Sequence, residues 1–132
     1  SSGILIASDL DLENIIRNAN QKVDILAVSF HWGTEYSEHN ARQKTLAYKA
    51  VENGAELVVG HHPHVIQDTE EYKGALIMYS LGNLIFDQYF SEETMQGLIV
   101  EVSFSGDKLE SYQKKLVKLN SYFQPQEILD YP

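Results

Sequence analysis

Two short apolar runs, each leading into a histidine, constrain most strongly what this chain can fold into. Residues 25–30 (Ile-Leu-Ala-Val-Ser-Phe) lead into His31, and residues 57–59 (Leu-Val-Val) lead into a loop with three further histidines. Apolar residues on both faces are typical of buried parallel strands. Because open α/β folds bind ligands at the carboxyl ends of such strands, we expect the two histidine-bearing ends to form a site there.

The loop after the second run holds His61, His62 and His64, three of the five histidines in the chain. A buried imidazole loses free energy unless it finds hydrogen-bond partners, so a core has little use for three of them. Neutral imidazole is, however, the commonest metal ligand. In an extended segment His62 and His64 project to one side, and Pro63 favours that geometry at His62. The spacing fits one ion at this pair or, if the loop turns, two ions reached by His61 and His64.

Three residues besides the histidines are candidates for chemistry. Glu35 is either a ligand, a carboxylate that orients an imidazole, or an ordinary solvated side chain. Trp32 is expected to pack or to line a substrate cleft, and Asn83 to form a simple turn or to contact a phosphate. His39, in a polar loop, is expected at the surface. With no Gly-rich phosphate loop or nucleophile elbow in the sequence, the residues favour metal-assisted chemistry.

Charge and cysteine content exclude several classes of function. The 132 residues include 19 acidic and 10 basic side chains, which gives a formal net charge of -9. Such a surface repels polyanions, and no run of Lys or Arg reverses the field locally, so nucleic-acid binding is not expected. Cysteine is absent, which excludes a disulfide framework, a thiolate zinc site and a thiol nucleophile.

Hydrophobic periodicity predicts a βαβαβ arrangement in the first half of the chain. The expected elements are a strand at 4–7, a helix near 10–21, a strand at 24–30, a helix capped by Asn40 and ended by Gly54, and a strand at 56–60. Asn is a favoured N-cap residue, and Gly is favoured just past a helix end. The arrangement predicts right-handed parallel units, with the strand at 24–30 in a central position.

The second half changes to an antiparallel pattern. Residues 65–72 and 75–80 read as a hairpin with its turn at Lys73-Gly74, and residues 97–104 and 108–119 read as a strand pair turning at Gly106-Asp107. A polar tail is expected after residue 119. The whole chain therefore predicts an α/β fold in one domain, with a βαβαβ first half followed by antiparallel strands.

Four blocks, in order and over about half of the chain, carry a family resemblance. They are residues 24–36, which include His-Trp-Gly-Thr-Glu-Tyr; 54–67, which include Gly-His-His-Pro-His; 71–74 (Glu-Tyr-Lys-Gly); and 79–88, which include Ser-Leu-Gly-Asn. These blocks resemble the bacterial capsule-synthesis family, the CapA-type poly-γ-glutamate biosynthesis proteins. That family is similar to calcineurin-like metallophosphoesterases, which implies a four-layer α/β/β/α sandwich.

The resemblance also implies a cofactor and a second part of the fold. It implies a divalent ion (Mn, Zn or Fe) held by His31, by His61 or His62, and by His64. The family's earlier Gly-Asp and Asn-Asn-His motifs are not in this sequence. Residues 1–132 therefore resemble the C-terminal portion of a single domain, whose N-terminal half or a companion chain supplies the remaining ligands.

The function that the resemblance implies is metal-dependent hydrolysis or transfer on a cell-envelope polymer. His31 and Glu35 are then candidate catalytic residues, and Trp32 and Asn83 candidate substrate contacts. The expected partners are an anionic polymer or phosphoester and other capsule-synthesis proteins, at a membrane-associated, extracytoplasmic cell surface. The alternative is a non-catalytic assembly or binding factor for polymer export. A purely structural metal site is disfavoured, because such sites close with four nearby ligands.

Overall fold

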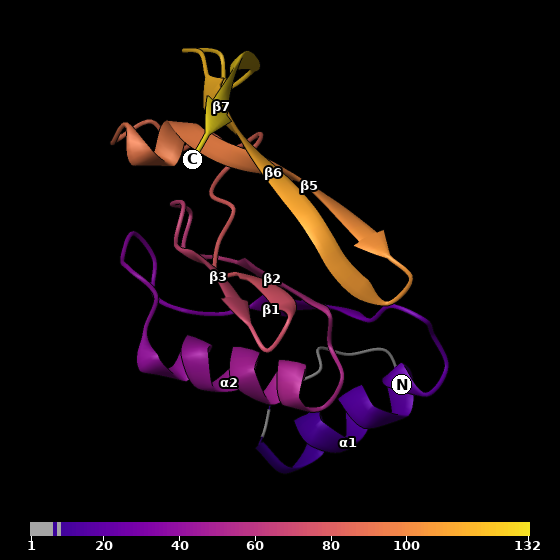
Figure 1. Cartoon of the computed structure of the whole chain (residues 1–132). Helices are drawn as coiled ribbons and strands as arrows, with labels where there is room; N and C mark the ends of the chain where they lie inside the picture. The colour runs from indigo at the N-terminus through magenta and orange to yellow at the C-terminus, as the bar shows by residue number, and fades with distance from the viewer. Residues whose placement is uncertain (1–6, 8) are drawn as a thin grey trace.

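The computed structural model describes residue 7 and residues 9–132, which form two α-helices and two β-sheets (Figure 1). The elements are α1 (Asp9–Asn20), β1 (Ala27–His31), α2 (Ala41–Glu52), β2 (Leu57–His61), β3 (Thr69–Tyr72), β4 (Ala75–Met78), the 3-10 helix η1 (Glu93–Met95), β5 (Gln96–Ser105), β6 (Lys108–Leu119) and β7 (Pro125–Tyr131). Both α-helices lie on one side of the first sheet, and the second sheet lies on the other side. The described residues thus form three layers, and the α/β class is confirmed.

The first sheet has the strand order β1-β2-β4-β3. Strands β1, β2 and β4 are parallel, whereas β3 pairs antiparallel with β4 across the Lys73-Gly74 turn, so the predicted parallel unit and hairpin are confirmed. Lys73 and Gly74 both have positive φ, 50° and 85°, as the common two-residue hairpin turns require. The strand predicted at 4–7 lies, apart from Ala7, outside the described residues.

The central position predicted for β1 is wrong for the part of the sheet that the structure describes. There β1 is an edge strand, and β2 is its neighbour. Val28 and Phe30 turn toward the helices, while Ala27, Ser29 and His31 are exposed. An apolar sequence on both faces predicts burial but does not say how many neighbours a strand has.

Helix α2 begins and ends as its sequence predicts. The side chain of Asn40 accepts a hydrogen bond from the backbone N–H of Gln43, and Gln43 returns the bond to Asn40, which forms a capping box. Gly54 follows the C-cap with φ of 111°, a conformation that glycine adopts without strain. Leu46, Ala47 and Ala50 pack into the core beneath the first sheet.

The core lies between the two helices and the first sheet. It contains Leu12, Ile16, Phe30, Trp32, Leu46, Ala47, Ala50, Ala55, Val58, Ile77 and Tyr79. Trp32 stacks on Phe30 with ring centroids 4.5 Å apart, and its indole N–H donates to the Tyr79 carbonyl at 2.8 Å. Gly60 lets these segments approach, because a Cβ there would lie 1.9 Å from that carbonyl oxygen.

The second sheet is antiparallel with the order β5-β6-β7. Strands β5 and β6 match the predicted pair, but the polar tail predicted after residue 119 is wrong. The side chain of Asn120 accepts hydrogen bonds from the backbone of Tyr122 and Gln124, and this turn leads into β7, which pairs with β6. Ile128 and Leu129 in β7 are both exposed, so the strand lacks the alternation that predicts a half-buried strand.

A seam of backbone contacts joins the two sheets. An isolated bridge pairs Gly82 with Gly97 of β5, and the N–H of Asn83 donates to the Gln96 carbonyl at 3.0 Å. A second bridge, between Ile66 and Leu81, ties the segment after β4 to the loop after β2. A Cβ at Gly97 would lie 2.5 Å from the Asn83 carbonyl oxygen, so only glycine fits there without movement. The seam holds the segment after β4 beside the histidine loop. No helix in the described part of the chain is long and apolar enough to cross a membrane.

Candidate metal centre

The two histidine-bearing strand ends meet, as predicted. His31 at the end of β1 and His61 at the end of β2 are register partners in the parallel ladder. The backbone N–H of Trp32 donates to the His61 carbonyl at 3.0 Å and continues the pairing past the strands. Both histidines lie at the carboxyl edge of the sheet, where α/β folds bind ligands, and both are exposed overall, although the His61 ring is partly buried by its neighbours.

Beyond the strand ends, the structure brings together Glu35, His62 and His64. One ligand atom from each lies within 4.8 Å of the others, with both histidines half-buried and the glutamate exposed. The His31 ring lies beside this group, with its centroid 4.6 Å from that of His62. His61 remains next to His31 through the strand register. The metal-ligand and catalytic roles assigned to these residues stay predictions.

The backbone of the histidine loop is strained where the candidate ligands lie. His62 has φ of 104°, His64 has φ of 60° and Tyr36, next to Glu35, has φ of 58°. Such conformations cost a non-glycine residue about 1–3 kcal/mol and persist only where the surroundings impose them. The extended geometry expected at His62 is therefore wrong: the loop turns at both histidines. Strain of this kind concentrates at functional sites.

Buried amides hold the two loops of the cluster against each other. The Gln67 side chain donates to the Ser37 carbonyl at 2.8 Å and accepts from the Gln43 side chain at 2.8 Å. The N–H of Tyr36 donates to the Pro63 carbonyl, also at 2.8 Å. Sequence reasoning missed this role of Gln43 and Gln67. Only Gln43 had a local signal, its place three residues after the N-cap.

The structure also gives the burial and contacts of three other residues discussed from the sequence. Trp32 is buried in the core, which favours packing over direct contact with a substrate. Asn83 is also buried, and its Oδ1 lies 2.9 Å from Nδ1 of His64. His39 is half-buried rather than at the surface as expected: its ring stacks on Tyr79 at 4.1 Å, and Nδ1 lies 3.3 Å from Asp68.

The electrostatic surroundings favour a neutral His61 ring. Burial is the larger effect that lowers the pKa of His61, and the neighbouring His31 ring lowers it further. A lowered pKa keeps the imidazole uncharged near neutral pH. Neutral imidazole is the form that binds metal ions.

A carboxylate farther along the first sheet has a lowered pKa. Burial of Glu70 opposes ionisation, but hydrogen bonds from the hydroxyl groups of Tyr48 and Tyr79 outweigh that effect and lower the pKa of Glu70. Burial, followed by the bond to Glu70, raises the pKa of Tyr79. Glu70 lies on β3, Tyr48 on α2 and Tyr79 directly after β4, so these hydrogen bonds link the first sheet to α2.

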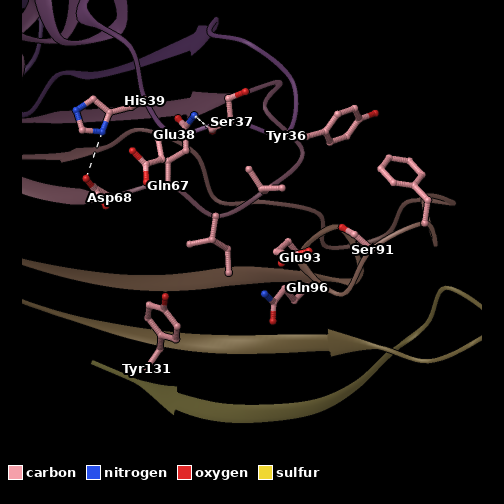
Figure 2. A pocket seen from close by; sticks show the side chains of 13 residues that line it. Tyr36, Ser37, Glu38, His39, Gln67, Asp68, Ser91, Glu93, Gln96 and Tyr131 are labelled. Carbon is pink, nitrogen blue, oxygen red and sulfur yellow. Dashed lines mark hydrogen bonds and ion pairs between the residues drawn. The ribbon is translucent and has the colours of Figure 1, made fainter.

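A cavity of about 760 Å³ adjoins the cluster between the two sheets (Figure 2). Tyr36 and Val65, the neighbours of Glu35 and His64, lie at its border. Glu38, Asp68 and Glu93 are among its lining residues, and none of the described residues that line it is Lys or Arg. A polyanion would therefore meet carboxylates in this cavity unless bound cations changed the field.

Comparison with known proteins identifies the chain's relatives. Residues 6–88 match the family described as "Bacterial capsule synthesis protein PGA_cap". The PGA biosynthesis protein CapA of Bacillus subtilis (strain 168) is 41% identical over 98 residues, which are 74% of this chain and 26% of that protein. The capsule biosynthesis protein CapA of Bacillus anthracis is 44% identical over 77 residues, 58% of this chain and 19% of that protein.

A more distant relative is named for polyglutamine synthesis. A probable polyglutamine synthesis accessory protein of Mycobacterium tuberculosis is 32% identical over 65 residues, 48% of this chain and 17% of that protein. The chain thus spans about a quarter or less of the length of these relatives. The family match itself covers more than half of the chain and includes both histidine-bearing strand ends. The chain therefore belongs to the bacterial capsule synthesis protein (PGA_cap) family.

Proposed function

We propose that this chain contributes the histidine-bearing part of a metallophosphoesterase-like site, and that the whole protein hydrolyses or transfers groups on a cell-envelope polymer. The observation that carries the proposal is the approach of Glu35, His62 and His64 to within 4.8 Å of one another. The relatives are named for capsule and PGA biosynthesis, which supports a capsule or poly-γ-glutamate polymer as the context.

The donors in the cluster suit a divalent ion. Two imidazoles and a carboxylate form a ligand set that Zn, Mn and Fe accept. His31, against the His62 ring, and His61, its register partner, are available to hold a second ion. A bound ion would polarise a phosphoryl or acyl oxygen and lower the pKa of a bound water. The strained backbone at His62 supports a functional rather than an incidental cluster.

We further propose that the rest of the domain, or a companion chain, docks on the edge of β1 that no described strand pairs with, and completes a four-layer sandwich. A groove of about 850 Å³ runs between α1 and β1 and is lined mainly by apolar residues, among them Ile15, Leu26 and Val28. An open strand edge pairs readily with another strand. The docked part of the domain, or the companion chain, would supply the remaining metal ligands. In this proposal the protein works at the extracytoplasmic, membrane-associated surface with other capsule-synthesis proteins.

Elemental analysis tests the metal site. Two proteins are prepared: the wild-type chain and a longer chain that includes the rest of the domain. The longer chain is also made with the double substitution His62→Ala/His64→Ala. Each protein is loaded with Mn²⁺ or Zn²⁺ and then desalted. We expect the longer chain to retain about one or two ions, and the same chain with the double substitution to lose them. His39→Ala is the matched control and should retain metal. Metal-free longer protein after loading would refute the site.

A second candidate function is a non-catalytic binding factor, favoured by an exposed apolar loop beside the cluster. Leu84, Ile85, Phe86, Tyr89 and Phe90 are all exposed. Contiguous exposed apolar side chains often mark interaction surfaces. Hydrolysis of an aryl phosphodiester by the metal-loaded longer protein, lost in the double histidine variant, supports the enzyme. Polymer binding without turnover, weakened by Ile85→Ser and Tyr89→Ser, supports the binding factor.

A further inference from the structure

The side chain of Asn83 connects the candidate metal centre to η1 and to the loop before it, which lead into the second sheet. It is only 5% exposed, and both of its polar atoms have partners. Its Nδ2 donates to the Thr94 carbonyl at 2.9 Å and to Oε1 of Gln88 at 3.3 Å, and its Oδ1 lies 2.9 Å from Nδ1 of His64. We propose that Asn83 is a positioning residue that holds neutral His64 in the tautomer with its hydrogen on Nδ1.

The Thr94 contact determines which way the Asn83 amide faces. A backbone carbonyl oxygen can only accept a hydrogen bond, so the amide atom against Thr94 must be the NH₂ group. The amide oxygen then has to face His64. In the reversed orientation two oxygens would lie 2.9 Å apart in a buried place, and loss of this hydrogen bond would cost about 1–3 kcal/mol.

The orientation of the amide in turn determines the His64 tautomer. An amide oxygen has no hydrogen to give, so Nδ1 of His64 must be the donor in a contact of 2.9 Å. A neutral imidazole carries one ring hydrogen, which leaves Nε2 with a free lone pair. Outer hydrogen-bond partners of this kind orient metal-binding histidines and set the nitrogen that they offer. Asn83 would therefore present Nε2 of His64 as the ligand atom.

A second link from Asn83 reaches the other loop of the cluster. Gln88 accepts from Asn83 and donates to the Tyr36 hydroxyl at 2.8 Å, and Tyr36 adjoins Glu35. The Thr94 hydroxyl donates to the Gln88 carbonyl at 2.9 Å and so closes the loop between them. Asn83 thus bonds directly to one candidate ligand and through one further side chain to the neighbour of another.

The positioning role of Asn83 rests on the proposed metal site, but the His64 tautomer is measured without metal. In the wild-type chain, treated with chelator at mildly alkaline pH, ¹⁵N correlation spectra of the histidine rings report the tautomer of each. We expect His64 to show a pyrrole-type nitrogen at Nδ1 and a pyridine-type nitrogen at Nε2. The opposite assignment in the wild-type chain would overturn the proposal, whether or not any variant folds.

Two substitutions separate positioning from a merely structural role. Asn83→Asp keeps an oxygen that accepts from His64 but loses the donation to Thr94, whereas Asn83→Leu loses both contacts. We expect the Asp variant to keep the Nδ1-protonated tautomer and the Leu variant to show a mixture. The same tautomer in all three proteins would overturn the proposal, because a structural role predicts similar rings in the two destabilised variants.

Metal titration of the longer chain then distinguishes this inference from the proposed function. If wild type binds Zn²⁺, we expect Asn83→Leu to weaken the affinity by about 10–100-fold, as loss of an outer-sphere partner does, and Gln88→Leu to weaken it less. An unchanged affinity in Asn83→Leu would count against the positioning role. If wild type binds no Zn²⁺, the proposed function fails, while the ring spectra of the metal-free chain still decide whether Asn83 sets the tautomer.

Discussion

The two sheets of the molecule are stabilised in different ways. All four residues of β4 in the first sheet are buried, and this sheet packs against helices on one side and the second sheet on the other (Figure 1). The longer strands β5 and β6 alternate between exposed and partly buried side chains, with few fully buried ones, such as Leu98 and Val117. The candidate site lies on the tightly packed sheet, so its geometry depends on contacts that tolerate little change.

Alanine substitutions at Gly60, in the first sheet, and Gly106, in the second, should show the largest difference in stability between the two sheets. A Cβ at Gly60 in β2 would lie 1.9 Å from the Tyr79 carbonyl and 2.3 Å from the Trp32 indole nitrogen. Gly60→Ala should therefore reduce the free energy of unfolding by about 4 kcal/mol or more, or prevent folding. Gly106, in the β5–β6 turn, has open space around it, and Gly106→Ala should cost about 1–2 kcal/mol for its φ of 64° alone. Urea unfolding measures both, and equal losses would remove the contrast.

The buried amides of Gln43 and Gln67, which hold the loops of the cluster together, should show the next largest effect. Gln43→Leu leaves the buried Gln67 oxygen without its donor and should cost about 1–3 kcal/mol. In the double variant with Gln67→Leu the cost should be less than the sum of the two single losses, because the variants share one bond. Gln113→Leu on the exposed side of β6 is the control and should change stability by less than about 0.5 kcal/mol. Strict additivity in the double variant would argue against a coupled network.

The strained histidine loop predicts an unusual order of stability. Because His62 has φ of 104°, His62→Gly should be more stable than His62→Ala by about 1 kcal/mol. At His31, a strand position, the order should reverse, since glycine weakens a strand by about 0.5–1 kcal/mol relative to alanine. Thermal unfolding of the four variants checks both orders. Alanine more stable than glycine at position 62 would show that the loop is not strained there.

The smallest effect expected concerns acid stability at Glu70. Its folded-state pKa is lowered from an ordinary value of 4.5, so its stabilising contribution is complete above that value and is lost as the pH falls through the folded value. Glu70→Gln should therefore show a weaker loss of stability below about pH 4.5 than wild type. Glu110→Gln, at an exposed position in β6, serves as control. Identical acid profiles for wild type and Glu70→Gln would contradict the assignment.

Much of the fold follows from local patterns. The Asn40 cap, the Gly54 helix end and the Lys73-Gly74 turn each depend on neighbours within a few residues, so their residue types predict them well. Strand β7 was not predicted, because its apolar residues do not alternate with polar ones. Its pairing with β6 stabilises the strand instead. The edge position of β1 also depends on which strands lie beside it, which no local pattern records.

The candidate site, like the fold, has features that local sequence patterns predicted and features that depend on tertiary contacts. The residue types and their order predicted that His31 and His61 end neighbouring strands, because parallel strands of an α/β fold present their carboxyl ends together. The residue types left open whether the loop is extended or turns, since left-handed conformations are rare for residues other than glycine and are imposed at His62 and His64 by surrounding contacts. The bond between Asn83 and His64 joins positions 19 residues apart, from the segment after β4 to the loop after β2.

The sequence by itself determined the family, the α/β class and the presence of imidazole donors at two strand ends. These properties reside in composition, periodicity and short motifs, which act over a few residues. Only the tertiary structure decided that Glu35 joins His62 and His64, and that Asn83 faces His64. The reason is physical: buried amides and a glycine seam, distant in sequence, fix those loops by hydrogen bonds and close packing that no local pattern encodes.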